Sequence, residues 1–138
     1  MQETMADVII RIVAAHYPAA QGIYLFGSQG EGSAWPGSDV DIALLLPHDQ
    51  ARREQALSLS QCRFDLEQAL GREVDLVNAR QVSTVFQKEI ISGRLLKAAD
   101  RYAVDEFEML VMSYYQKLNE ERQGILEAFR RTGRAYDL

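Results

Sequence analysis

Three aspartates stand where short strands are expected. Asp39 and Asp41 open the segment DVDIALLL at 39–46, and Asp75 lies at the centre of EVDLV at 73–77. Alternate strand residues point to the same face, about 6.6–6.8 Å apart along the chain, so Asp39 and Asp41 can both reach one hard cation. If the two strands pair as neighbours, about 4.8 Å apart, all three carboxylates converge on one patch.

Three carboxylates so close together repel one another strongly unless divalent cations neutralise them. Magnesium fits this set because it prefers a few carboxylates and keeps its other positions for water and substrate phosphates. Two such ions, about 3.5–4 Å apart, stabilise both the attacking and the leaving oxygen of a displacement at phosphorus. The aspartates therefore predict a two-magnesium site for a phosphate-bearing substrate. In isolation, the alternative is an N-capping Asp-x-Asp turn or solvated strand ends.

A Gly-Ser pair, Gly27 and Ser28, directly follows the apolar strand expected at 23–26. Glycine lets phosphate oxygens approach main-chain N–H groups closely, and the serine adds a hydroxyl donor. If a helical turn starts there, its N-terminus favours an anion further. Such a pair is common and by itself indicates only a turn, so its weight rests on its place between two strands.

The remaining pattern predicts the elements that hold these residues. Helical spacing of apolar residues favours helices at 3–16, 50–70, 81–91 and about 100–131, with strands at 23–26, 39–46 and 73–77 and either an edge strand or an extended connector at 94–97. Gly71 is expected to end the second helix, and Gly124 is a weak point in the last one. The order predicts an α+β fold of α/β two-layer type, in which helices pack on a small mixed sheet and a long C-terminal helix follows. We expect a core at 1–98 and a helical extension of the same domain at 99–138.

Composition narrows the class of protein. The 138 residues suffice for one folded domain, and the net charge of −5 disfavours general nucleic-acid binding. The basic residues Arg130, Arg131 and Arg134 are expected to complement the end of the last helix or to contact a partner. The single cysteine, Cys62, is expected to be buried, and the chain has no apolar run of about 18 residues. We therefore expect a cytoplasmic protein without a signal peptide or a membrane span.

The residues also carry a resemblance. Gly27-Ser28, ten intervening residues and then Asp39-Val40-Asp41 resemble the motif of the polymerase-beta-type nucleotidyltransferase superfamily, over about residues 22–97. The later segment EVDLV is similar to the place where that superfamily supplies its third carboxylate. The resemblance implies a nucleotidyltransferase-like fold with Asp39, Asp41 and Asp75 as catalytic metal ligands, and with Gly27 and Ser28 as nucleotide-binding residues.

One position departs from the pattern. Many relatives carry a basic residue straight after the Gly-Ser pair, whereas this chain has Gln29. Arg94 or Lys97 can supply the missing positive charge, but an ordinary surface role explains both equally well.

The small size makes the chain similar to the minimal nucleotidyltransferases, and the long last helix favours the MntA-type antitoxins of HEPN/MNT toxin-antitoxin systems. The resemblance implies a protein adenylyltransferase that uses Mg²⁺, with two ions expected, to transfer AMP from ATP to a tyrosine hydroxyl of a cognate HEPN-domain ribonuclease toxin. It implies a hetero-oligomeric complex with that toxin and no direct contact with nucleic acid or membrane. Two alternatives stay open: a small-molecule nucleotidyltransferase of the aminoglycoside-modifying type, and a non-catalytic antitoxin that acts by occlusion.

Overall fold

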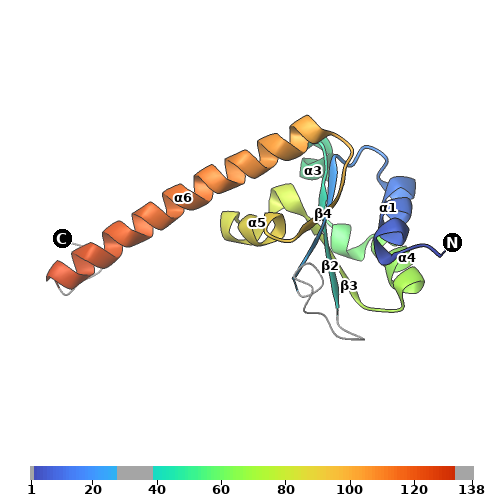
Figure 1. Cartoon of the computed structure of the whole chain (residues 1–138), viewed down its shortest axis with the longest axis horizontal. Coiled ribbons are helices and arrows are strands. Elements are labelled where there is room, and N and C mark those ends of the chain that lie inside the picture. The colour runs from blue at the N-terminus through green and yellow to red at the C-terminus, as the bar shows by residue number, and fades with distance from the viewer. Residues whose placement is uncertain (1, 28–38, 133–138) are drawn as a thin grey trace.

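The computed structural model describes residues 2–27 and 39–132, which form a mixed sheet with helices packed on it (Figure 1). The helices are α1 (Met5–His16), α3 (His48–Arg53), α4 (Gln61–Leu70), α5 (Thr84–Ile91) and α6 (Arg101–Thr132), with 3-10 turns η1 (Leu57–Leu59) and η2 (Ala79–Gln81). The strands are β1 (Gly22–Phe26), β2 (Val40–Leu45), β3 (Val74–Asn78) and β4 (Arg94–Ala98). The expected order of elements is confirmed except over 50–70, and the segment at 94–97 is an edge strand. The glycine-rich segment at 28–38 lies outside the described residues.

The topology of the sheet determines which strand ends lie side by side. The strand order is β3-β2-β1-β4, with β1 antiparallel to both of its neighbours and β2 parallel to β3. The parallel pair requires a crossover connection, which contains α3, η1 and α4. Because β1 runs opposite to β2 and β3, its C-terminal end lies at the same edge of the sheet as their N-terminal ends. Gly27 directly follows the end of β1, and the three aspartates lie at the starts of β2 and β3.

Apolar side chains alternate along the central strand and build a core on each face. Ile42 and Leu44 pack with the helices α1 and α4, whereas Ala43 and Leu45 pack with α5 and α6. Figure 1 shows the sheet nearly edge-on, with α1 and α4 on one side and α5 and α6 on the other. The α+β class is confirmed, and helices on both faces add a third layer to the two expected. Cys62 is buried in the first of these cores, as predicted.

A single helix over 50–70 is wrong, because the chain forms α3, η1 and α4 there. Glu54 leaves the helical region at φ −87° and ψ 90°, and Leu57 then turns its side chain into the core. Ser60 starts the next helix: its hydroxyl donates to the Leu57 carbonyl at 2.6 Å and accepts from the Arg63 N–H at 3.2 Å.

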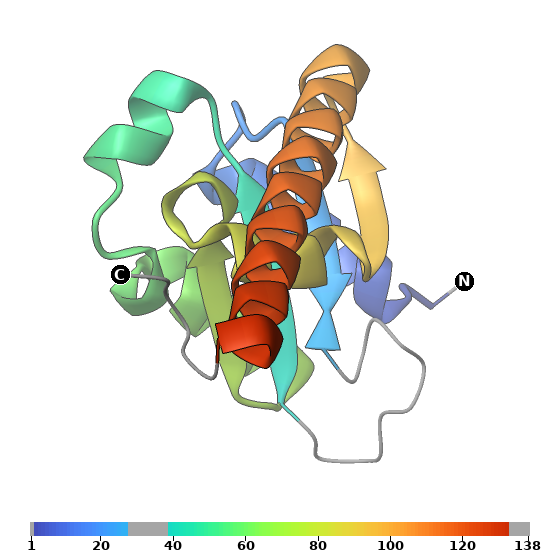
Figure 2. The same ribbon diagram turned by 90° about the vertical axis from the view of Figure 1, so that its left-hand side faces the viewer.

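The C-terminal helix α6 is unbroken, and its 32 residues span about 48 Å. Its first half packs on the sheet through Val104, Phe107 and Val111, and the buried Tyr24 hydroxyl donates to the Glu108 carboxylate at 2.6 Å. The second half projects away from the sheet, and Figure 2 shows the helix crossing in front of it. Within residues 2–27 and 39–132, no helix combines the length and apolar character that a membrane span requires.

Candidate active site

The predicted pairing of the two acidic strands is confirmed. Asp41 of β2 lies opposite Asp75 of the parallel strand β3, and on its other side it lies opposite Phe26, the last residue of β1. Asp39 precedes β2 by one residue and lies on the same face as Asp41 because strand side chains alternate. Asp41 is half-buried, whereas Asp39 and Asp75 are exposed. The topology therefore brings the three predicted carboxylates to one edge of the sheet.

These carboxylates repel one another. The pKa of the Asp41 carboxyl is raised, first by burial and then by the negative charges of Asp75, Asp39 and Glu89. Among the residues that the structure describes, no lysine, arginine or histidine forms an ion pair with Asp39, Asp41 or Asp75. An electron-rich oxygen set without a described counter-charge fits a divalent cation in its donor chemistry. No three His, Cys, Asp or Glu side chains of the described residues are already grouped as metal ligands, so ligation requires the side chains to converge.

Sequence reasoning missed the fourth acidic group, Glu89. It lies on α5, whose Phe86 ring meets the Phe26 ring edge-on at a centroid distance of 5.7 Å. After α5, a Cβ added at Gly93 would lie 2.5 Å from the Leu25 carbonyl oxygen and 2.9 Å from the Phe26 Cα. The close approach that Gly93 permits brings the end of α5 to the site. No local sequence pattern predicts this, because the charge of Glu89 acts on Asp41 only once α5 has packed against β1.

Gly27 occupies the turn directly after β1. Its φ of +66° lies in the left-handed region, which favours glycine. A Cβ added at Gly27 would overlap the Asp41 Oδ2 atom, so the main chain at this turn runs directly beside the Asp41 carboxylate. The predicted partner, Ser28, and the departing position, Gln29, lie outside the described residues.

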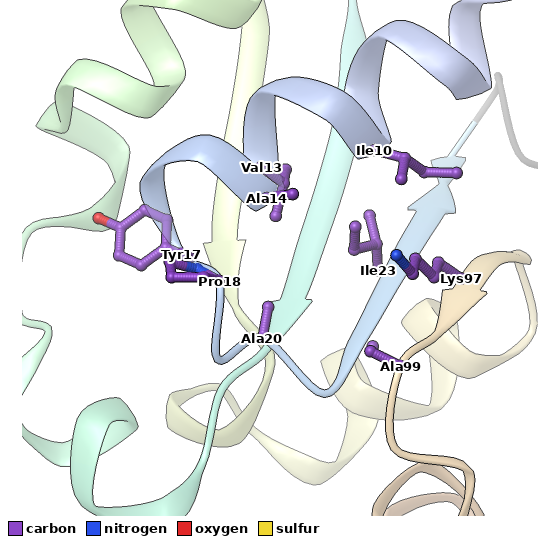
Figure 3. Close-up of a pocket in the computed structure, with 10 residues that line it drawn as sticks. Ile10, Val13, Ala14, Tyr17, Pro18, Ala20, Ile23, Lys97 and Ala99 are labelled. Carbon is purple, nitrogen blue, oxygen red and sulfur yellow. The ribbon is translucent and has the colours of Figure 1, made fainter.

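The two basic residues considered as a replacement charge lie on the other face of the sheet. Arg94 pairs with Leu25 and Lys97 with Ile23, and both strand partners belong to the core under α1. Figure 3 shows Lys97 at a small pocket of about 40 Å³, next to Ile10 and Ile23. Asp41 shares the opposite face with Phe26. Register therefore separates Arg94 and Lys97 from the carboxylates by the thickness of the sheet.

A short mixed sheet that gathers paired carboxylates beside a glycine turn is the architecture of a nucleotidyltransferase. Residues 9–102 match the family model described as "Polymerase beta, Nucleotidyltransferase", so the chain belongs to this family. The matched region runs from α1 to the first residues of α6 and includes β1, β2, β3 and β4.

Similar proteins narrow the branch of the family. The protein adenylyltransferase MntA of Shewanella oneidensis is 33% identical over 130 residues, which cover 92% of this chain and 88% of that protein. A crystal structure of a toxin-antitoxin with AMP-PNP contains a chain with 31% identity and a TM-score of 0.67, which covers 91% of this chain and 98% of that chain. A structure of the tri-AMPylated Shewanella oneidensis HEPN toxin in complex with MNT antitoxin gives 30% identity and a TM-score of 0.64, with 94% and 99% covered.

Proposed function

We propose that this protein is an antitoxin that transfers AMP from ATP to a tyrosine hydroxyl of a cognate HEPN-domain toxin and thereby neutralises it. The pairing of Asp41 with Asp75 beside the Gly27 turn carries the catalytic part of the proposal. The relatives named as protein adenylyltransferase MntA and as partners of HEPN toxin support the choice of acceptor. Among the described residues, no further domain lies over the site, which leaves it open to a macromolecular acceptor. The projecting second half of α6 adds a surface that such an acceptor can contact.

Each residue of the site has its own role in the proposed transfer of AMP. Gly27, together with Ser28, would hold the triphosphate of ATP, while Asp39 and Asp41 would hold Mg²⁺ and Asp75 would contribute to a second ion. When bound, Mg²⁺ neutralises phosphate charge and stabilises the attacking and leaving oxygens. The acceptor oxygen forms a bond to the α-phosphorus as the bond from that phosphorus to the bridging oxygen breaks, and pyrophosphate leaves with the electron pair. Asp75 takes the proton of the acceptor hydroxyl.

Intact mass spectrometry of the partner protein tests the proposal. The protein encoded beside this chain is purified, incubated with this chain, Mg²⁺ and ATP, and weighed. We expect a mass increase of one or more AMP units, and no increase with the Asp41→Asn or Asp39→Ala variant because the cation loses a carboxylate. Both variants should bind the partner and melt at or above the temperature of the wild-type chain in EDTA, since each substitution removes a repelling charge.

Three outcomes discriminate among the candidate functions. A stable complex without any added AMP would favour neutralisation by occlusion. Transfer to an aminoglycoside or another small hydroxyl compound, but not to the partner, would favour the small-molecule alternative. Normal transfer by both aspartate variants would contradict the assignment of the site.

A further inference from the structure

A pocket of about 380 Å³ opens on the outer side of β3, the edge strand that carries Asp75. Asp75 lines one end of it, and Val77 continues the wall along the strand. The connection after α3 contributes Glu54 and Ser58, and the residues at the end of η2 contribute Gln81 and Val82. A volume of this size is at the lower end of the range for ligand pockets, and it is large enough for one side chain with its neighbouring residue.

The pocket lies on the side from which the acceptor must approach. Gly27, Asp41 and Asp75 follow one another across β1, β2 and β3, and the pocket comes next, beyond β3. In a displacement at phosphorus, the attacking and leaving oxygens lie roughly in line on opposite sides of the reacting atom. If the triphosphate occupies the Gly27 side, as proposed above, the attacking hydroxyl enters from the Asp75 side. The pocket opens on that side, and Asp75 itself is part of its lining.

Hydrogen bonds hold the pocket wall in place and occupy part of the edge of β3. The Asn78 Nδ2 atom donates to the carbonyl oxygens of Ala51 and Glu54 at 3.0 and 3.2 Å, which ties the segment bearing Glu54 to β3. The outward main-chain groups of Val74 are already paired with two side chains of α4: its N–H donates to the Glu67 carboxylate at 2.9 Å, and its carbonyl accepts from the Arg63 guanidinium at 3.0 Å. An incoming chain therefore cannot form sheet hydrogen bonds at Val74, next to Asp75, and side-chain contacts have to hold it there.

The lining is acidic and rich in acceptors. It contains the acidic residues Glu54 and Asp75, and no lysine, arginine or histidine is among the described residues that line it. The Tyr17 hydroxyl donates to one Glu54 oxygen at 3.2 Å, which positions that carboxylate. Asn78 adds a buried Oδ1 atom that has no hydrogen-bond partner among the described residues, and this oxygen makes the local potential more negative. The apolar side chains Val77 and Val82 provide a surface for an aromatic ring.

We propose that this pocket is the acceptor subsite: it receives a polypeptide segment in which a lysine or arginine lies next to the hydroxyl residue that is modified. The basic side chain pairs with Glu54, the ring of the acceptor residue packs on Val77 and Val82, and its hydroxyl reaches Asp75. The subsite rests on the proposed AMP transfer and extends it by the chemistry of the acceptor sequence.

Steady-state transfer of AMP to the purified partner protein tests the subsite, with two competing peptides as probes. Both peptides have a central tyrosine, flanked by lysines in one and by glutamates in the other. We expect the lysine peptide to inhibit wild-type transfer at a concentration about tenfold lower than the glutamate peptide. Glu54→Gln should raise the KM for the partner about five- to tenfold and remove the preference between the peptides, with an unchanged KM for ATP, because one charge pair of this kind contributes about a factor of ten.

A matched variant separates the pocket from a loss of net charge. Asp49→Asn removes one negative charge from α3, where its side chain is 77% exposed and outside the pocket, and it should leave both KM values and the peptide preference unchanged. Glu54→Gln keeps the main-chain carbonyl that Asn78 uses and an acceptor for Tyr17, so the wall should stay in place. Equal inhibition by the two peptides, or an unchanged partner KM in Glu54→Gln, would overturn the subsite while AMP transfer stands. A wild-type chain that adds no AMP to the partner would overturn both.

Discussion

Gly27 meets two separate requirements at one residue: a left-handed φ and the absence of a Cβ beside Asp41. Gly71 shares the same φ of +66° at the end of α4, but a Cβ added there meets nothing within 4 Å. The two glycines therefore separate the cost of the backbone conformation from the cost of crowding the carboxylate.

Alanine at each glycine measures these two costs. We expect Gly71→Ala to lower the free energy of unfolding by about 1 kcal/mol, the cost of a left-handed residue with a side chain, and to keep full transfer activity. Gly27→Ala should lose more stability and at least about tenfold in kcat/KM, because its methyl group displaces the Asp41 carboxylate. Urea unfolding and initial rates of AMP transfer check both values. Equal activity of the two variants would show that the approach of Gly27 to Asp41 has no catalytic role.

At this scale, the sequence predicts residues whose placement depends only on local geometry. Asp39 and Asp41 follow from strand alternation, and Asp75 follows once its strand pairs with theirs. Glu89 could not be predicted in this way, because it joins the site through the packing of Phe86 on Phe26 and through Gly93. Helical periodicity marks the buried side of α5 but not the element against which that side packs.

Single elements were predictable where apolar spacing and end signals agree. α1 begins after Thr4, whose side chain accepts from the Asp7 N–H at 3.1 Å in a capping box, and α4 ends at Gly71. The break between α3 and α4 was missed because Leu59 and Phe64 complete an apolar helical pattern, although the structure leaves them 81% and 53% exposed. Leu57 is buried in the core instead, because η1 packs against β3, a contact that the local sequence does not reveal.

Two further glycines test the stability of α6 and the packing of α5 against β1. A Cβ at Gly124 meets nothing within 4 Å, so Gly124→Ala should stabilise α6 by about 0.5–1 kcal/mol through helix propensity alone. Gly93→Ala should destabilise the protein by about 1–3 kcal/mol and lower transfer activity, because its methyl group pushes α5 away from β1. Circular dichroism melts and transfer rates provide the measurements. A stabilising Gly93→Ala variant would contradict the close packing of α5 against the strand.

On the scale of the whole molecule, α6 has one apolar side, which is buried in the core along its first half and continues along the half that projects from the sheet. At about 100° per residue, a sector roughly 120° wide contains the buried Val104, Phe107 and Val111 and continues beyond the core. The continuing apolar residues in that sector are Tyr114, Tyr115, Leu118, Ile125, Leu126 and Phe129, with the charged Arg122 between them. Lys88 of α5 lies over the Tyr115 ring at 5.5 Å, and past this contact the helix projects from the sheet (Figure 1). The pattern that packs the first half on the core is thus left without a described cover in the second half.

We expect the continued side of α6 to be a docking surface for the proposed toxin partner, and two exposed positions on it test this role. Ile125 and Phe129 are 39% and 51% exposed in the free chain, so the double variant Ile125→Glu/Phe129→Glu should melt like the wild type. Each side chain contributes about 1.5–3 kcal/mol when fully buried by a partner, so the variant should bind the toxin at least about a hundredfold more weakly.

The matched control is Tyr102→Glu/Met109→Glu on the other side of the same helix, where both residues are more than 70% exposed. It adds the same charge to the same element and should bind normally. Isothermal titration calorimetry measures the affinities, and intact mass spectrometry measures AMP transfer at toxin concentrations below and above the weakened Kd. Transfer by the Ile125→Glu/Phe129→Glu variant should recover at high toxin concentration, because the carboxylates at the sheet edge are untouched. Wild-type affinity of that variant, or an equal loss in the control, would place the toxin elsewhere on the molecule.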